Sequence, residues 1–379
     1  MEQERLALLA LRLIPGVGDK LFRELIGQTG SATEVFRLPT SRLTRINGIG
    51  SHTAKAIRTS KTIQEAENQF KKAEQHLTRI LFFTEPAYPE RLKNVPDAPT
   101  VLFVKGNINL NKPKIIAVVG TRKSTSYGRA LTHELIQGLK KYDPVIVSGL
   151  AYGIDIQAHT SCLQTGIPTI GILGSGLDII YPSNHKSTAS KMTNSGAIIS
   201  EQPFGTGPDA HHFPARNRII AGLSDAIVVV EAGEKGGALI TSDIMNSYNR
   251  DVFAFPGSVF NPWSVGCNQL IRNHQAQLIT GADDLASMMN WDSPTEVLTD
   301  QNKVPGDIQH QDGISGSILT AISLRKTATM DELQFITGLN SNILSSRLLM
   351  LELEGRINAM PGNLYCLSDG RTQNVLRFS

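Results

Sequence analysis

The sequence predicts an α/β fold built on a doubly wound, mostly parallel sheet, preceded by a helical segment. Between residues 114 and 289, short apolar runs alternate with amphipathic stretches, a pattern typical of parallel strands joined by helices. One run, at residues 227–230, is unbroken and mostly β-branched, as expected for a strand covered on both faces. Residues 1–75 show the apolar spacing of helices instead, so the sheet is expected to follow them.

The bulk composition limits the kinds of protein that this chain can be. Its 379 residues are 40% hydrophobic and 19% charged, which suits two or three domains. The formal net charge is only +3, so a polyanionic partner would have to be bound by locally concentrated charge. The three cysteines lie far apart without metal-ligand spacing, which predicts no metal site among them and favours a cytoplasmic protein. We expect no cofactor. The short amphipathic N-terminus predicts no signal peptide and no membrane partner.

Residues 1–76 are predicted to form a helical domain that contains two tight turns. Residues 14–18 (IPGVG) and 46–50 (INGIG) share the form apolar-x-Gly-apolar-Gly, and each precedes a predicted helix, at 20–26 and 53–57. Such turns present N–H groups at a helix start, where they can hold a backbone phosphate. The pair resembles helix-hairpin-helix motifs of SAM-like domains in DNA proteins. Alternatively, the glycines only turn the chain between packed helices.

Residues 77–290 are predicted to hold the sheet and its ligand edge. An entry pair of strands is expected at 80–83 and 101–104, and the strands that follow are expected at 115–119, 145–147, 169–173, 197–199, 227–230 and 252–255, with helices such as 129–139 between them. Nearly every strand ends in glycine, serine or a charged residue. Ligands of open α/β sheets bind at the carboxyl ends of strands, so this edge is predicted to hold phosphates along a line.

Two segments at this edge carry the strongest binding signal. Residues 120–124 (GTRKS) offer one glycine, small hydroxyls and a basic pair, which suits a phosphate better than a dinucleotide. Pro214 fits the first turn of a helix, which places Arg216, Asn217 and Arg218 near its mouth. Arginine forks match phosphate oxygens bidentately. Alternatively, the two arginines form ion pairs at a domain seam. Asp155 is interpreted as a helix N-terminal cap, in preference to a metal ligand.

A series of segments resembles a known family in order and spacing. They are VVGTRKSTSYGRA, SGLAYGIDIQAH, ILGSGLDIIYPSNH, IISEQPFG, FPARNRIIAGLSDAIVVVEA, GGALITSD and FAFPG. Over residues 87–281 they are similar to the DNA-processing protein A family, also called DprA or Smf. The resemblance implies an extended Rossmann fold that binds single-stranded DNA as a homodimer. It also implies a recombination mediator that protects incoming DNA and loads RecA recombinase during natural transformation.

The resemblance also implies where DNA binds. Carried over by motif, the family's pocket would include Arg122, Phe213, Arg216, Asn217, Gly236 and Gly237. With the neighbouring loop residues, the full predicted set is Gly120, Thr121, Arg122, Ser148, Gly149, His211, Phe213, Arg216, Asn217, Arg218, Lys235, Gly236, Gly237 and Thr241. Some family members have a lysine just before the Phe-Pro pair, a region that Ala210, His211 and His212 occupy in this chain. We expect Arg122, Arg216 and Arg218 to neutralise phosphates and Phe213 to stack a base.

The C-terminal part is predicted to be a linker at 291–312 and a winged helix at 313–370. Helices are expected at 318–323, 330–337 and 341–354, with a wing hairpin around Pro361 and Gly362. This arrangement resembles the winged helix of many family members. The would-be recognition helix carries Arg347 but also Glu352 and Glu354, which favours a protein contact or regulatory role over base reading.

The main alternative function is a nucleotide-binding hydrolase similar to the phosphoribohydrolases that share this Rossmann variant. Those enzymes carry a Gly-Gly-x-Gly-Thr-x-x-Glu loop, whereas residues 236–241 here read GGALIT and no glutamate stands at the motif position. No nucleophile–base pair or carboxylate metal cluster is apparent in the sequence. We therefore predict a binding protein without enzymatic activity. The family resemblance and the apolar side chains within residues 265–279 (Val265, Leu270, Ile271, Leu278) predict a homodimer through the sheet domain.

Overall fold

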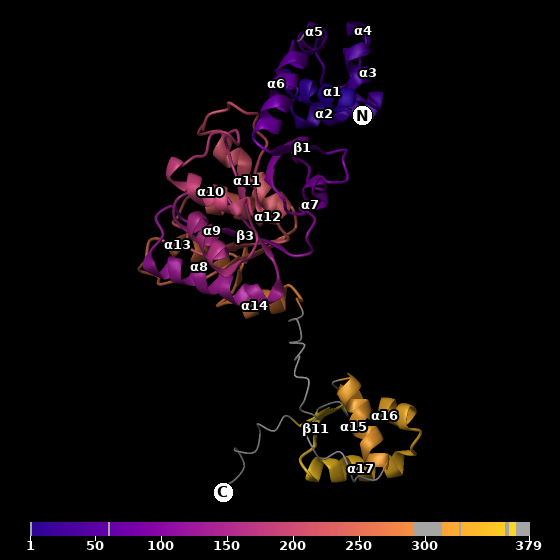
Figure 1. Cartoon of the computed structure of the whole chain (residues 1–379). Coiled ribbons are helices and arrows are strands. Elements are labelled where there is room, and N and C mark those ends of the chain that lie inside the picture. The colour runs from indigo at the N-terminus through magenta and orange to yellow at the C-terminus, as the bar shows by residue number, and fades with distance from the viewer. Residues whose placement is uncertain (1, 60, 292–312, 326, 361–363, 369–379) are drawn as a thin grey trace. The chain divides into compact units, whose positions relative to one another are not determined.

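The computed structural model describes residues 2–59, 61–291, 313–325, 327–360 and 364–368 (Figure 1). Two compact units divide the chain, Met1–Thr295 and Glu296–Ser379. The first unit carries the sheet and the N-terminal helices, and the second carries the winged helix. Within the described ranges, no helix is both long enough and apolar enough to cross a bilayer.

In the described part of the first unit, nine strands form one sheet in the order β1-β2-β6-β5-β4-β3-β7-β8-β9. Their bounds are β1 Thr78–Phe82, β2 Val101–Gly106, β3 Ile115–Val119, β4 Val145–Ser148, β5 Thr169–Ile172, β6 Ala197–Ser200, β7 Ala226–Val229, β8 Asp251–Ala254 and β9 Gln277–Leu278. The pairs from β6 through β9 are parallel, and β1–β2 and β2–β6 are antiparallel. The predicted doubly wound, mostly parallel sheet is confirmed. The short edge strand β9 was not predicted.

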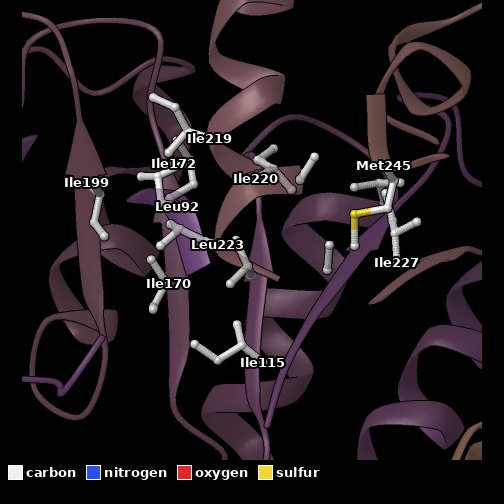
Figure 2. Packing of buried hydrophobic residues seen from close by; sticks show 14 of the residues in the cluster. Leu92, Ile115, Ile170, Ile172, Ile199, Ile219, Ile220, Leu223, Ile227 and Met245 are labelled. Atoms are coloured by element: carbon white, nitrogen blue, oxygen red, sulfur yellow. The ribbon is translucent and has the colours of Figure 1, made fainter. Parts of the chain in front are cut away.

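Helices cover both faces of the sheet, because successive apolar side chains of each strand project to opposite faces. The helices of this region are α7 Glu90–Lys93, α8 Ser126–Leu139, α9 Ile154–Thr165, α10 Lys186–Met192, α11 His212–Leu223, α12 Gly237–Ser247, α13 Val265–Arg272 and α14 Ala282–Met288. On one face, Ala117 and Ile227 share a core with α11 and α12. On the other face, Ile116 and Val228 share a core with α8, α9 and α14. Figure 2 shows Ile170 and Ile172 of β5 near Ile219 and Leu223 of α11, and Ile227 of β7 near Met245 of α12.

The order of strands reverses its direction at β3. The chain runs from β3 outward through β4, β5 and β6 on one side, and then returns to β7, β8 and β9 on the other. The connections that leave β3 and β7 therefore cross to opposite sides, and a crevice opens between them at the carboxyl edge. The topology thus places the predicted phosphate loop after β3 and the glycine-rich loop after β7 at the edge where ligands bind.

The N-terminal helices pack directly on the antiparallel edge of the sheet. They are α1 Glu2–Arg12, α2 Asp19–Thr29, α3 Ala32–Arg37, α4 Thr40–Leu43, α5 Ser51–Thr59 and α6 Thr62–Gln75. Both predicted turns form, with Gly16 at φ +88° and Gly48 at φ +84°, values that favour glycine. Phe22 of α2 lies in the same core as Phe82 and Phe103 of β1 and β2. The predicted boundary at residue 76 therefore separates two sequence patterns that belong to one compact unit (Figure 1).

The second unit has the element order of a winged helix. It contains α15 Gly313–Arg325, β10 Thr327–Thr329, α16 Met330–Thr337, α17 Ser341–Leu353, β11 Ile357–Met360 and β12 Leu364–Leu367. The strands form an antiparallel sheet in the order β10-β12-β11. A capping box between Thr329 and Glu332 begins α16. All of the predicted linker at 291–312 except Trp291 lies outside the described residues, as do Pro361 and Gly362 of the predicted wing hairpin.

Candidate nucleic-acid interface

A cavity of about 780 Å³ lies at the carboxyl edge of the sheet, at the point where the strand order reverses. The loop after β3, the first turns of α11 and the loop that leads from β7 into α12 contribute most of its wall. Of the predicted residues, the wall includes Gly120, Thr121, Arg122, Phe213, Arg216, Asn217, Lys235, Gly236, Gly237 and Thr241. The chain folds so that these segments, which are far apart in sequence, meet at one place.

Arg122 and Phe213 form the open side of this cavity. The Arg122 guanidinium lies 5.8 Å from the centre of the Phe213 ring, at cation–π distance. Arg122 is exposed, and within the described ranges it forms no ion pair. Tyr181 packs on the Phe213 ring with centroids 5.6 Å apart. An exposed guanidinium beside a supported aromatic ring can meet a phosphate and an unpaired base together.

Arg216 lies under the cavity. It is 4% exposed, and its Nη1 donates a 2.5 Å hydrogen bond to the carbonyl of Ile172 at the end of β5. Burial lowers the pKa of Arg216 to about 10, an effect opposed by the nearby Asp155 carboxylate and reinforced by Arg122. A methyl group at Gly149 would lie 2.1 Å from Nη1, so only glycine leaves room for the guanidinium there. Arg216 is therefore a fixed positive charge in the cavity floor.

The interpretation of Asp155 as a helix cap is wrong, because the N-cap of α9 is Gly153. Asp155 lies inside the first turn, and its carboxylate accepts hydrogen bonds from the N–H groups of Gly149 (3.1 Å) and Ala151 (3.4 Å). It therefore secures the loop after β4 beside Arg216. No cluster of three or more metal-ligating side chains occurs within the described ranges.

Glu231 holds the loop after β3 against the end of β7. Its backbone carbonyl accepts from the Thr121 N–H at 2.7 Å, and its carboxylate accepts from the Thr125 N–H and hydroxyl at 2.9 and 2.5 Å. Thr125 in turn caps α8 through the N–H of Gly128, which is why α8 begins at Ser126 and not at the predicted residue 129. Across the crevice, α12 begins at Gly237 with Gly236 as its N-cap and no side-chain cap, and both glycines line the cavity.

Some predicted residues do not line the cavity: Ser148, Gly149, His211 and Arg218. Ser148 is fully buried, and its hydroxyl donates to the carbonyl of Val118 at 2.6 Å. Gly149 provides the space for Arg216 described above. His211 is exposed one residue before α11 begins. Thr241 does line the wall, although its hydroxyl donates to the carbonyl of Gly237 at 2.7 Å.

Arg218 points away from the cavity toward the N-terminal helices. Its guanidinium forms an ion pair with Glu201 and a second one at 3.4 Å with Asp19 of α2, and it donates to the carbonyl of Asp97. The side chains of Arg218 and Glu201 are only 15% and 6% exposed. The alternative interpretation, an arginine in an ion pair at a seam, therefore describes Arg218.

The sequence did not single out other residues that line the cavity. Lys123 and Trp263 form a second cation–aromatic pair in its wall, with the Lys123 Nζ 5.9 Å from the centre of the ring. Tyr181 supports Phe213. Lys123 could have been found from its place in the basic pair after β3. Trp263 and Tyr181 carry no local signal, because only the topology brings their loops to this edge.

A parallel sheet with a basic, glycine-lined crevice at its switch point is typical of the Rossmann class of ligand-binding proteins. Comparison with known proteins gives the family. The family described as DNA recombination-mediator protein A matches residues 79–290, and the DprA winged helix domain matches residues 305–363. The chain belongs to the DNA-processing protein A (DprA/Smf) family of DNA recombination mediators.

Individual relatives agree with this assignment. Protein Smf of Synechocystis is 32% identical over 94% of this chain and 97% of its own length. DNA processing protein DprA of Streptococcus pneumoniae is 44% identical over 53% of this chain and 71% of its own length. The X-ray structure of DprA from Streptococcus pneumoniae superposes with a TM-score of 0.67 at 33% identity, over 75% of this chain and 97% of that one. The Helicobacter pylori protein, described for its single-stranded DNA binding mode, gives a TM-score of 0.51 at 30% identity, over 56% and 95%.

The position of Arg218 generates a stability prediction. We expect Arg218→Ala to lower the free energy of unfolding by about 3 kcal/mol, because it leaves the buried Glu201 carboxylate without its cation. Urea denaturation monitored by circular dichroism measures this. Arg37→Ala, which removes an exposed ion pair with Glu34, is the matched control and should cost less than about 1 kcal/mol. Equal small losses in both variants would contradict the proposed role of Arg218.

Proposed function

We propose that this chain binds single-stranded DNA in the cavity at the carboxyl edge and acts as a recombination mediator there. The observation that carries the proposal is the exposed Arg122 guanidinium beside the Phe213 ring. A relative with the same fold, from Helicobacter pylori, is described as binding single-stranded DNA. In a chain with a formal net charge of only +3, affinity for a polyanion has to come from such a local group.

Different side chains of the wall are suited to different parts of a DNA strand. Arg122 and Lys235 are exposed and can each approach a phosphate, while the buried Arg216 supplies a fixed field from below. The uncapped start of α12 adds N–H donors for a further phosphate oxygen. Phe213 supplies a ring on which only an unpaired base can stack, because the bases of a duplex already stack on one another. This combination favours single strands over duplex DNA.

A hydrolase is the alternative function, and the charges of the cavity favour binding over catalysis. Asp155 is the one carboxylate that lines the cavity in the described part of the chain. It already accepts two N–H groups and faces Arg216. Asp243, the acid that follows the glycine-rich loop, is exposed and lies outside the wall. A carboxylate that activates water or attacks a sugar would need a free lone pair directed into the cavity.

We also propose a cytoplasmic homodimer that delivers DNA to RecA recombinase during natural transformation, as the family resemblance implies. The apolar residues from which a dimer was expected have different surroundings. Leu270 and Ile271 pack into the core of their own chain. Leu278 is 44% exposed on β9, at the open edge of the sheet. An open edge strand with an exposed leucine is suited to pairing with a second copy.

The DNA site predicts different losses for the cation and the ring. Arg122→Ala should weaken binding of oligothymidylate and flatten the slope of log affinity against log salt by about 0.7, since one phosphate contact is lost. Phe213→Ala should cost about 1–3 kcal/mol with the slope unchanged, because a stack releases no counterions. Arg216→Ala should follow the pattern of Arg122→Ala, but its burial makes a folding control necessary. Fluorescence anisotropy across a salt series measures both quantities.

Lys191→Ala is the matched control for the loss of charge, because Lys191 is an exposed cation of α10 that lies outside the cavity wall. It should leave affinity and slope almost unchanged. If folded Arg122→Ala and Phe213→Ala proteins keep the affinity and slope of the unaltered chain, the site is misplaced. The two glycine turns before α2 and α5 would then become the leading candidate for DNA contact.

The surface of the winged helix predicts that it contributes little to single-strand binding. On α17, exposed Leu349, Met350 and Leu353 are followed by the acidic Glu354, a poor surface for phosphates. A protein that ends at Thr295, the boundary of the first compact unit, should keep the affinity of the full chain for oligothymidylate. Parallel anisotropy titrations test this. A large loss of affinity in the shortened protein would assign DNA contact to the winged helix.

The open sheet edge predicts a dimer that a charge can disrupt. Sedimentation velocity at micromolar concentrations should give a dimer for the unaltered protein and a monomer for Leu278→Lys, since a lysine on an edge strand opposes pairing. Met288→Lys changes a side chain of equal 44% exposure on α14 and should leave the dimer intact. A concentration-independent monomer of the unaltered protein would exclude the homodimer.

A further inference from the structure

The loop between β8 and α13 brings a tryptophan to the cavity, next to the phosphate loop. The Trp263 ring packs against Gly233, where an added methyl group would lie 3.4 Å from the ring. The Lys123 Nζ lies 5.9 Å from the centre of the same ring. Both side chains line the cavity, and neither belongs to the set predicted from the sequence.

Two cation–aromatic pairs therefore lie side by side in one wall. Arg122 faces Phe213 at 5.8 Å and Lys123 faces Trp263 at 5.9 Å. The two cations are consecutive residues, so the groups that they can bind are close together. A nucleotide backbone repeats one phosphate and one base at every step, so two neighbouring cation–aromatic pairs match two successive nucleotides of one strand.

The backbone around Trp263 is held by hydrogen bonds at both ends of its loop. The Asn268 side chain accepts from the N–H of Gly257 at 3.2 Å and donates to its carbonyl at 2.9 Å. The Tyr127 hydroxyl donates to the carbonyl of Pro256 at 2.9 Å. The N–H of Trp263 donates to the side chain of Asn261 at 3.0 Å. The ring is thus positioned before a ligand arrives, which lowers the entropy cost of binding.

The Lys123 contact is the weaker of two contacts that the Trp263 ring can make. A lysine over an aromatic ring at an exposed site gains less free energy than a nucleobase stacked on the same ring. A base can therefore displace the ammonium group. The released Lys123, which is exposed and flexible, can then neutralise the phosphate that belongs to that base.

We propose that Trp263 and Lys123 form a second nucleotide subsite, in which the base stacks on Trp263 and its phosphate pairs with Lys123. The subsite extends the strand held by Arg122 and Phe213, so it rests on the proposed function. Its ligand is a further unpaired nucleotide of single-stranded DNA, and any base fits, because every base offers a flat face to the ring.

The tryptophan content of the chain allows a direct test. The chain has two tryptophans, Trp263 and Trp291. Trp291 packs on Tyr142 with centroids 6.1 Å apart and lies near Lys114, at the amino ends of β3 and β4, which is the edge opposite to the cavity. In a Trp291→Phe protein, oligothymidylate should quench the fluorescence of Trp263 in a saturable manner. In a Trp263→Phe protein, which keeps Trp291, the same titration should leave the fluorescence unchanged.

Affinity measurements separate the subsite from the proposed function. Trp263→Ala should weaken binding of a long oligothymidylate about tenfold, and Trp263→Phe should retain most of the affinity, because a ring remains. Lys123→Ala should flatten the salt slope by about 0.7. Phe260→Ala is the matched control, since Phe260 is a 94% exposed aromatic residue on the same loop that lies outside the cavity wall. It should bind like the unaltered protein.

The subsite is overturned if Trp263 fluorescence stays constant at DNA concentrations that saturate anisotropy. It is also overturned if Phe260→Ala weakens binding as much as Trp263→Ala, which would move the contact to the loop tip. If Arg122→Ala weakens binding while Trp263→Ala and Lys123→Ala do not, the subsite is wrong and the proposed function stands. If all of these variants bind like the unaltered protein, both proposals fail.

Discussion

The buried guanidinium of Arg216 is the constraint on which the arrangement of the cavity depends. A buried charge is tolerated only when nearby groups compensate it, and here they come from the ends of neighbouring strands. The carbonyl of Ile172 lies at the end of β5, and Gly149 and Asp155 lie in the loop and the helix α9 that come after β4. Arg216 itself lies in α11. Its Nε lacks a hydrogen-bond partner among the described residues. An anion in the cavity would stabilise this charge further, so the fold is electrostatically prepared for a negative ligand.

The sequence predicted the sheet well because its strands are local signals. Unbroken β-branched runs such as residues 227–230 can be buried on both faces without help from distant residues, and their order along the chain sets the parallel connections. The loop after β3 was recognised for the same reason. Arg218 shows what a linear pattern misses. Residues two apart on a helix point about 200° away from each other, so Arg216 and Arg218 could not both face one cavity.

The remaining differences between prediction and structure come from contacts over long sequence distances. Trp263 and Tyr181 reach the cavity only because β8 and β5 end at the same edge as β3. The N-terminal helices share a core with β1 and β2, and Asp19 of α2 forms an ion pair with Arg218 of α11. No pattern within residues 1–76 indicates such a surface, since an amphipathic helix shows which face is buried but not what covers it. The predicted boundary at residue 76 therefore marks a change from helical to strand-like spacing of apolar residues, and the packed core continues across it.

In the unliganded protein, the aromatic rings of the cavity wall are covered by cations of the same chain. With Arg122 over Phe213 and Lys123 over Trp263, flat apolar surfaces at an open edge are already covered by charge and attract other apolar surfaces less. In the proposed complex, occupation by DNA would be an exchange, in which each cation leaves a ring for a phosphate and each ring accepts a base. A strand analogue with an uncharged backbone would displace the cations from the rings but offer them no phosphate to bind. Under this proposal the wall would select for bases that are attached to phosphates, and it would discriminate against flat hydrophobic molecules that carry no negative charge.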